Sequence, residues 1–308
     1  MKSIGVIGEL FRNRTVLLMF LPVAVLLFLF NYLPLFGLVI AFKDFDFQKG
    51  ILGSDWMQPL LNNFDYLFSS ETAFRAVRNT ILLNALFITV GLVFEVGFAL
   101  LLNEIRNKYF KRFAQSLTFL PFFISWIVVG VFAYNLLNFD NGLINRVLTA
   151  FGANPIDFYS TASLWPLILV VTIRWKVTGY GTIIYLAALT SVDNSYYEAA
   201  AIDGASRWQQ MRYISIPMLR PTIIILTLLA VGKIMNADFS MFYAMVGDAS
   251  LIFPTTDVID TFVYRSLRKS GDIGMASAAG FMQSLIAFVL VIGSNYIARK
   301  IDRDSAIF

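Results

Sequence analysis

The sequence contains no cysteine and no histidine among its 308 residues. Without cysteine, there is no disulfide framework, no thiol nucleophile and no thiolate metal site. Without histidine, the chain lacks the most common general base and the most common metal ligand of proteins. We therefore expect no metal site and no catalytic residues in this chain.

Charged residues are also scarce. They make up 14% of the chain, against about 25% in a typical soluble domain. Hydrophobic residues make up 58%, and the mean hydropathy is +0.70. The apolar residues fall in long runs, and a helix of about 20 such residues spans the roughly 30 Å hydrocarbon core of a bilayer. The composition therefore predicts an all-α membrane protein.

Six membrane-spanning helices can be drawn within a single transmembrane domain that covers residues 1–308. The predicted spans are 15–41, 78–102, 114–138, 164–189, 218–237 and 279–298. The first run is too long for a signal peptide, contains Pro22 and Pro34, and is followed by no small-residue cleavage site. We interpret it as a retained helix.

The distribution of charge orients these spans. The net charge of +4 and the isoelectric point near 9.2 could suggest nucleic acid, but Lys and Arg are also enriched in the cytoplasmic loops of membrane proteins. Taken together, the N-terminal segment, residues 103–113 and 190–220, and the C-terminal tail contain 13 Lys and Arg against seven Asp and Glu. We therefore predict that both termini and residues 190–220 are cytoplasmic, and we expect lipid but no nucleic acid as a partner.

Residues 191–221 read SVDNSYYEAAAIDGASRWQQMRYISIPMLRP and are polar and charged, although apolar spans flank them. Ser195 and Glu198 have the spacing of a capping box, and the three alanines that follow favour a helix. Gly204 stands where a helix C-terminus requires a residue that tolerates positive φ. This part of the stretch therefore predicts a short helix that ends at a glycine bend.

A second capping box, Ser206 with Gln209, opens another short helix. We expect this helix to run to about Ile216 and to stop at Pro217, before the next span. The side chains available for burial on it are those of Trp208, Met211 and Ile214. Residues 191–217 are therefore predicted to form a compact helical hairpin, called the 191–217 hairpin below.

Two interpretations of this hairpin stay open. In the first, Glu198 only caps a helix and Gly204 only ends one. In the second, the hairpin enters a cleft on a partner, because its run of alanines lets another surface approach closely.

The same residues carry a resemblance to a known family. The pattern Glu198-Ala199-Ala200, three residues, Gly204, nine residues, Ile214-Ser215-Ile216-Pro217 resembles the EAA signature of permease subunits of binding-protein-dependent ABC importers. Ile216 stands where leucine is usual, which is a conservative departure. The stretches LPFFISWIVVG and TDVIDTFVYRSLRKSGDIGMASAAGFMQS extend the resemblance over nearly the whole chain. They are similar to the carbohydrate branch, and within it to polysaccharide and oligosaccharide permeases of the LplB type.

The resemblance implies a type I ABC importer permease fold with six transmembrane helices and cytoplasmic coupling helices. It implies a bacterial cell-membrane protein that forms half of a translocation path for oligosaccharides. The implied partners are a second permease, most often a different chain, two ABC ATPase subunits and an extracellular solute-binding protein. By this resemblance the residues that couple to the ATPase are Glu198, Ala199, Ala200, Asp203, Gly204, Ile214 and Pro217.

ATP hydrolysis is expected on another polypeptide. A phosphate-binding loop needs the pattern G-x-x-x-x-G-K-[ST]. Gly232-Lys233 is the only Gly-Lys pair, Ile234 follows it, and no upstream glycine has the required spacing. We therefore expect ATP and Mg to bind to the ATPase subunits, and no cofactor to bind to this chain.

Ionisable residues inside the spans are Glu95, Arg174, Lys176 and Lys233, with Asp238 at the outer end of the fifth span. Each costs about 2.5–3.5 kcal/mol on insertion scales. Arg174 and Lys176 lie about 200° apart around a helix and cannot face one target without a local irregularity. One alternative is a structural ion pair with Glu95 or Asp238. The other is a cavity that favours an anionic sugar such as a uronate, because Arg binds carboxylates in a bidentate manner.

Aromatic residues near the fourth and fifth spans suit the faces of sugar rings, but aromatics also pack in helix bundles and membrane interfaces. The aromatic residues in or near these two spans include Trp175, Tyr180, Tyr185, Phe239, Phe242 and Tyr243. The candidate substrate path comprises Arg174, Trp175, Lys176, Tyr180, Asp238, Phe239 and Tyr243.

Three other functions compete with this interpretation. A secondary transporter driven by an ion gradient predicts internal inverted repeats, and no repeat is evident. A membrane enzyme acting on lipid-linked sugars predicts clustered acidic or histidine residues. A purely structural membrane anchor gives no function to the 191–217 hairpin.

Overall fold

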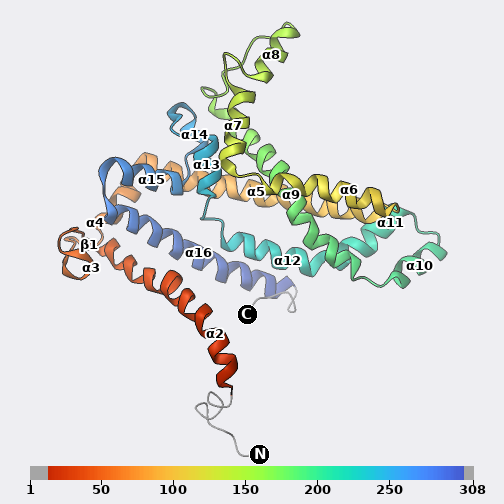
Figure 1. Ribbon diagram of the computed structural model, residues 1–308, viewed down its shortest axis with the longest axis horizontal. Helices are drawn as coiled ribbons and strands as arrows, with labels where there is room; N and C mark the ends of the chain where they lie inside the picture. Colours follow the sequence, from red (N-terminus) through yellow and green to blue (C-terminus); the bar gives the residue numbers. More distant parts are fainter. Residues whose placement is uncertain (1–12, 302–308) are drawn as a thin grey trace, which may run out of the picture. The chain divides into compact units, whose positions relative to one another are not determined.

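The computed structural model describes residues 13–301, most of them in helices (Figure 1). The charged residues of 1–12 and 302–308, on which the predicted orientation of the termini partly depends, lie outside the described residues. The chain divides into two compact units: one comprises the residues up to Leu67 with Ser266–Phe281, and the other comprises Phe68–Arg265 with the residues from Met282 onward. That residues 1–308 form a single domain therefore stays a prediction.

The first unit begins with a long apolar helical segment, as predicted for residues 15–41. It consists of α2 (Arg14–Leu27), the π-helical η1 (Phe28–Tyr32) and the 3-10 helix η2 (Leu33–Phe42). Two short antiparallel strands follow, β1 (Lys43–Asp44) and β2 (Asp55–Trp56), with α3 (Gly50–Gly53) between them and α4 (Asn62–Ser69) after them. Lys43 Nζ donates to the carbonyls of Ile51 and Ser54 at 2.8 and 2.9 Å, which closes this connection.

Two long helices form the scaffold of the second unit. They are α5 (Glu71–Glu104) and α9 (Trp165–Thr190), which pack along each other. They contain the second and fourth predicted spans. The Ser70 side chain caps α5 by accepting a hydrogen bond from the backbone N–H of Ala73.

The third predicted span, 114–138, is not one straight helix. The chain forms α6 (Lys108–Phe119) and the 3-10 helix η3 (Leu120–Phe123), then restarts as α7 (Trp126–Leu137) at an angle of 95°. Pro121 lies in η3, and Ser125 caps the new helix. Proline is a recognised cause of such breaks. The sequence pattern showed sufficient length and hydrophobicity but not this bend.

The fifth span differs from its prediction at both ends. The helix does not stop at Pro217, because α11 (Arg207–Gln210), the π-helical η5 (Met211–Ser215) and α12 (Ile216–Gly232) form one continuous segment. Pro217 occupies the first turn of α12, where its missing N–H is tolerated next to a π-helical turn. At the other end, helical structure stops at Gly232, so residues 233–237 are not helical.

The remaining helices complete the two units. They are α8 (Leu143–Ala150), η4 (Ala162–Leu164), α10 (Asn194–Ile202), α13 (Phe239–Met245), η6 (Ser250–Ile252), α14 (Phe253–Thr256), α15 (Ile259–Ser270) and α16 (Ile273–Ile301). Among the described residues, five helices are long and apolar enough to cross a membrane, or six if the bent pair counts as one span.

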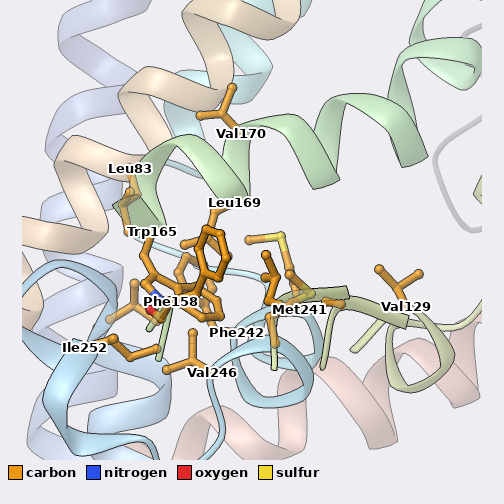
Figure 2. Packing of buried hydrophobic residues seen from close by; sticks show 14 of the residues in the cluster. Leu83, Val129, Phe158, Trp165, Leu169, Val170, Met241, Phe242, Val246 and Ile252 are labelled. Atoms are coloured by element: carbon orange, nitrogen blue, oxygen red, sulfur yellow. Dashed lines mark hydrogen bonds between the residues drawn. The ribbon is translucent and has the colours of Figure 1, made fainter. Parts of the chain in front are cut away.

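A hydrophobic core in the second unit joins α5, α7, α9 and α13. Trp165, Leu169 and Phe242 lie at its centre (Figure 2) and are almost fully buried. The indole Nε1 of Trp165 donates to the carbonyl of Phe158 at 2.7 Å, so this large side chain is buried without an unpaired polar group. The core fixes α13 against the long helices.

A second core in this unit lies where α5, α9 and α12 approach the 191–217 hairpin. It includes Ala99, Leu100, Tyr185, Leu189 and Leu219, with Met211 packed against it. In Figure 1, α10 and α11 lie at one end of α9 and α12, while α13 and α14 lie toward the other end. The hairpin is thus attached to three long helices at a single end.

Candidate functional site

The predicted first helix of the 191–217 hairpin exists as α10, but its cap differs from the prediction. Asp193, not Ser195, is the N-cap, and its Oδ1 accepts a hydrogen bond from the backbone N–H of Ser195 at 2.9 Å. This hydrogen bond holds the pKa of Asp193 below its usual value. Glu198 makes no capping bond and is exposed. Because Asp193 and Ser195 are both good caps, sequence spacing alone did not decide between them.

The glycine bend is confirmed. Gly204 has φ +80°, and Asp203 is the C-cap of α10. The N–H of Gly204 donates to the carbonyl of Ala201 at 3.1 Å, and the N–H of Ala205 donates to that of Ala200 at 2.9 Å. These two bonds define a Schellman motif, which ends a helix with a left-handed residue.

We expect Gly204→Ala to loosen this bend, because an L-residue in the left-handed region costs about 1–2 kcal/mol. Hydrogen exchange of residues 200–206 should become several-fold faster than in the unchanged protein. Gly204→Asn, which tolerates positive φ better, should lie between the two. Identical exchange in all three proteins would contradict this role of Gly204.

The second predicted capping box is confirmed. Gln209 Oε1 accepts from the backbone N–H of Ser206 at 2.7 Å, and Ser206 Oγ accepts from the N–H of Gln209 at 3.4 Å. The expected burial of Trp208 is wrong, since 66% of this residue is exposed. Met211 and Ile214 are half-buried, Ile214 within the π-helical turn, and Pro217 follows in α12.

The surface of α10 is not covered by the other residues that the structure describes. None of its residues is buried, and the exposed fraction reaches 87% at Ile202 and 54% at Tyr196. Ala199 is exposed and Ala200 half-buried, beside the exposed Glu198. The hairpin is nevertheless ordered from within: Tyr197 Oη and Ser215 Oγ are 3.0 Å apart, and Gln210 Nε2 donates to the carbonyl of Ala205 at 3.2 Å. α10 is therefore an ordered helix whose side chains are exposed or half-buried among the described residues.

In the interior of the second unit, Arg174 of α9 forms an ion pair with Glu95 of α5. The Nη1–Oε1 distance is 3.1 Å, and the two side chains are 10% and 19% exposed. The structural ion pair considered from the sequence therefore exists. The Nε atom of Arg174 is buried without a hydrogen-bond partner among the described residues.

Two glycines make room for this pair. A Cβ at Gly91 would overlap the guanidinium of Arg174, and a Cβ at Gly181 would overlap the carboxylate of Glu95. Each glycine lies on the helix opposite the charged side chain that it accommodates, Gly91 on α5 and Gly181 on α9. The pair therefore depends on close approach of the α5 and α9 backbones.

Lys176 has a different environment, as the angular argument predicted. Its Nζ donates to the carbonyls of Pro121, Phe122 and Ile124, at distances of 2.5–3.3 Å. These carbonyls lie in η3 and at the break that follows it, and that of Pro121 also accepts from the backbone N–H of Ile124 at 3.1 Å. The Nζ also lies 5.2 Å from the Trp126 ring centroid. A buried ammonium thus satisfies the backbone of the broken span.

Asp238 caps α13 at the end of the non-helical segment. Its Oδ1 accepts from the N–H of Met241 at 3.1 Å, and its Oδ2 accepts from Trp126 Nε1 at 2.6 Å. The two rings of Phe239 and Tyr243 stack at 5.3 Å, and both lie near the ring of Tyr264. Tyr180 stacks on Phe122 with a centroid distance of 4.5 Å.

The predicted path residues are not gathered in one place. Arg174 and Asp238 line a cavity of about 610 Å³ between α5, α9 and α12. Trp175 lines an apolar hollow with Arg174, whereas Phe239 and Tyr243 line another beside α7. Lys176 and Tyr180 line none of these three. That all seven contact a substrate stays a prediction.

The cavity also contains polar residues that the predicted path did not include. They are Asn84, Glu95, Thr227, Lys233 and Asn236. Glu95 and Lys233 stand out in the sequence as ionisable residues within predicted spans. Asn84, Thr227 and Asn236 carry no comparable signal, and only the packing of α5 against α9 and α12 brings them together.

A family model and several known proteins match most of this chain. The family model described as "Binding-protein-dependent transport system inner membrane component" matches residues 87–303. Protein LplB of Bacillus subtilis is 35% identical over 98% of this chain and 94% of its own length. The polygalacturonan/rhamnogalacturonan transport system permease protein YteP of the same organism is 35% identical over 96% and 91%.

A solved structure has the same fold. It is the crystal structure of a bacterial ABC transporter involved in the import of the acidic polysaccharide alginate, and the matched chain has a TM-score of 0.86 at 30% identity. The match covers 96% of this chain and 98% of that chain. The expected type I importer permease fold is thereby confirmed. The chain belongs to the family of inner membrane components of binding-protein-dependent transport systems, and is a permease subunit rather than an enzyme.

Proposed function

We propose that this permease imports oligosaccharides that carry uronate carboxylates, and that two ATPase subunits drive it by docking on the 191–217 hairpin and its counterpart on a second permease. A solute-binding protein would deliver the sugar at the outer face. Closure of the ATPases on ATP would open the path outward, and hydrolysis would return it to the inward-facing state.

The uncovered surface of α10 carries this proposal. Three of its nine residues, Glu198, Ala199 and Ala200, form the start of the EAA pattern, and none of the nine is buried by the other described residues. Exposed apolar side chains such as Ile202 on an ordered helix indicate a protein interface. Glu198, Asp203 and Gly204 lie on the same exposed hairpin, so a partner can reach them together.

The choice of acidic sugars is supported by the named relatives and by charge. One relative is named for polygalacturonan and rhamnogalacturonan, and the similar solved transporter imports alginate. In this chain the cavity of about 610 Å³ contains the cations Arg174 and Lys233 and the carboxylates Glu95 and Asp238. Arg174 is paired with Glu95, so that Lys233 is the cation of this cavity without an ion pair among the described residues. Binding sites for small molecules have volumes of about 300–1,000 Å³ with a few placed polar groups.

The proposed topology places the hairpin in the cytoplasm. The loop contains Arg207 and Arg212, and the nearby α6 contains Lys108, Lys111 and Arg112. An excess of such residues close to spans favours the cytoplasmic side. The segments around α13 and α14 at the other end of α9 and α12 would then face the binding protein.

Reconstitution tests this function. The chain is assembled with its second permease and ATPase subunits in proteoliposomes, and uptake of labelled trigalacturonate is measured with the solute-binding protein outside. We expect uptake to require ATP inside the vesicles, because the ATPase subunits lie on the inside when the solute-binding protein is outside. We also expect uptake to persist when ion gradients are dissipated. Uptake by this chain alone, driven by a proton or sodium gradient, would instead establish a secondary transporter.

A further inference from the structure

A break in the fifth span borders the cavity between α5, α9 and α12. α12 ends at Gly232, and residues 233–237 follow without helical structure, although they lie within the predicted span 218–237. Three residues of this break, Lys233, Ile234 and Asn236, line the cavity. Irregular backbone at membrane depth is tolerated where it is buried in protein or lines a water-filled cavity. The break thus marks a polar part of the span.

Side chains from three other helices hold this break in place. Asn84 of α5 donates to the carbonyl of Ile234 at 2.8 Å, and Gln283 of α16 donates to that of Met235 at 3.0 Å. Asp260 of α15 accepts from the N–H of Ala237 at 2.9 Å. Each bond satisfies a backbone group that a continuous helix would have satisfied itself. These bonds therefore hold the backbone next to Lys233 in place before a ligand binds.

Lys233 is the cation of this cavity whose charge is still available. Its ammonium has no hydrogen bond or ion pair with any residue whose side chain the structure describes, and Lys233 is exposed and lines the cavity. By contrast, Arg174 is paired with Glu95 at 3.1 Å. Lys176 is bound to carbonyls of the broken third span and does not line the cavity. The carboxylate of Asp238, also in the lining, already accepts two hydrogen bonds.

We propose that Lys233 makes this cavity selective for anionic oligosaccharides, by pairing its ammonium with a uronate carboxylate of the sugar chain. The inference rests on the proposed transport function and specifies which residue recognises the acid. Glu95 neutralises Arg174, so the guanidinium contributes little net attraction to an anion. Asn84, Asn236 and Thr227 are available for sugar hydroxyls in the same lining.

A purely structural role for Lys233 makes a different prediction. Lys233 is the C-cap residue of α12, and a cation there interacts favourably with the last carbonyls of a helix. Loss of this interaction would weaken binding of charged and neutral sugars alike. A pair of ligands that differ in charge and little else therefore separates the two roles.

The experiment measures direct binding to the assembled transporter in lipid nanodiscs, without solute-binding protein, so that both faces are accessible. The ligands are α-1,4-linked trigalacturonate and its neutral methyl ester. We expect the intact protein to bind the acid about tenfold more tightly than the ester, as one charge-assisted hydrogen bond permits. Lys233→Gln should abolish this preference and leave the dissociation constant of the ester unchanged, whereas Lys233→Arg should retain the preference.

Arg220→Gln is the matched control, because Arg220 is an exposed cation of the same helix that does not line the cavity. It should retain the preference. The inference is overturned if Lys233→Gln keeps the preference or weakens acid and ester equally. If the intact transporter imports trigalacturonate in the vesicle assay while either of these results holds, only the assignment to Lys233 fails. If the intact transporter neither imports nor binds either sugar, the proposed function fails as well.

Discussion

Replacement of Ile202 by aspartate is expected to abolish ATP-driven uptake while the permease remains inserted in the membrane. Ile202 is 87% exposed on α10, so the isolated permease should tolerate the change. In the proposed complex the same residue is covered by an ATPase subunit, and a carboxylate buried there would lack a partner. We expect the affinity for the ATPase to fall about a hundredfold, which corresponds to about 2.7 kcal/mol.

Co-purification of the ATPase subunit and ATP-dependent uptake together check this expectation. Phe151→Asp provides a matched control, since Phe151 is also 87% exposed but lies at the C-terminus of α8. It should leave ATPase binding unchanged. Full ATPase binding by the Ile202 variant would show that α10 is not the docking surface.

Substitution of Glu198 tests whether ATP hydrolysis is coupled to uptake, rather than whether the ATPase subunit binds. Because its carboxylate caps no helix among residues 13–301, Glu198→Gln should leave α10 folded. We expect the ATPase to remain attached and to hydrolyse ATP, while uptake per ATP hydrolysed falls about tenfold through loss of one charge-assisted contact. Normal uptake would leave Glu198 without a role in coupling.

Removal of Glu95 is expected to be the most destabilising single change in the interior of the second unit. Glu95→Leu leaves the guanidinium of Arg174, 10% exposed, without its counter-ion. Breaking one side of a buried ion pair costs about 3–5 kcal/mol, whereas replacing both partners by apolar residues is often neutral. The double variant Glu95→Leu with Arg174→Leu should therefore recover most of the lost stability.

Thermal unfolding of the detergent-solubilised permease measures both variants. Asp55→Asn serves as the control, because the Lys49–Asp55 pair is exposed to solvent and should contribute little. Gly181→Ala should also lower the stability, since the Cβ of the new alanine would displace the Glu95 carboxylate. A double variant no more stable than Glu95→Leu alone would show that the pair is not the source of the effect.

The 191–217 hairpin was the part of the site best predicted from sequence. Its bend depends on Gly204, and its second cap depends on Ser206 with Gln209, all within a few residues of one another. The two incorrect predictions in this segment, the cap of its first helix and the end of its second, also depended on neighbouring residues. Asp193 competes with Ser195 as a cap, and the π-helical turn before Pro217 lets the helix continue where proline predicted its end.

The sequence by itself determined the class of protein, the approximate spans and the hairpin, because hydrophobic length and capping residues act over one or two helical turns. The tertiary structure decided the partners of the charged residues. Arg174 and Glu95 are 79 residues apart and meet only because Gly91 and Gly181 let α5 and α9 approach closely. Likewise, Lys176 is fixed by the broken third span, which leaves Lys233 as the available cation of the cavity. Such pairings depend on which helices pack together, and hydrophobic periodicity carries no information about that choice.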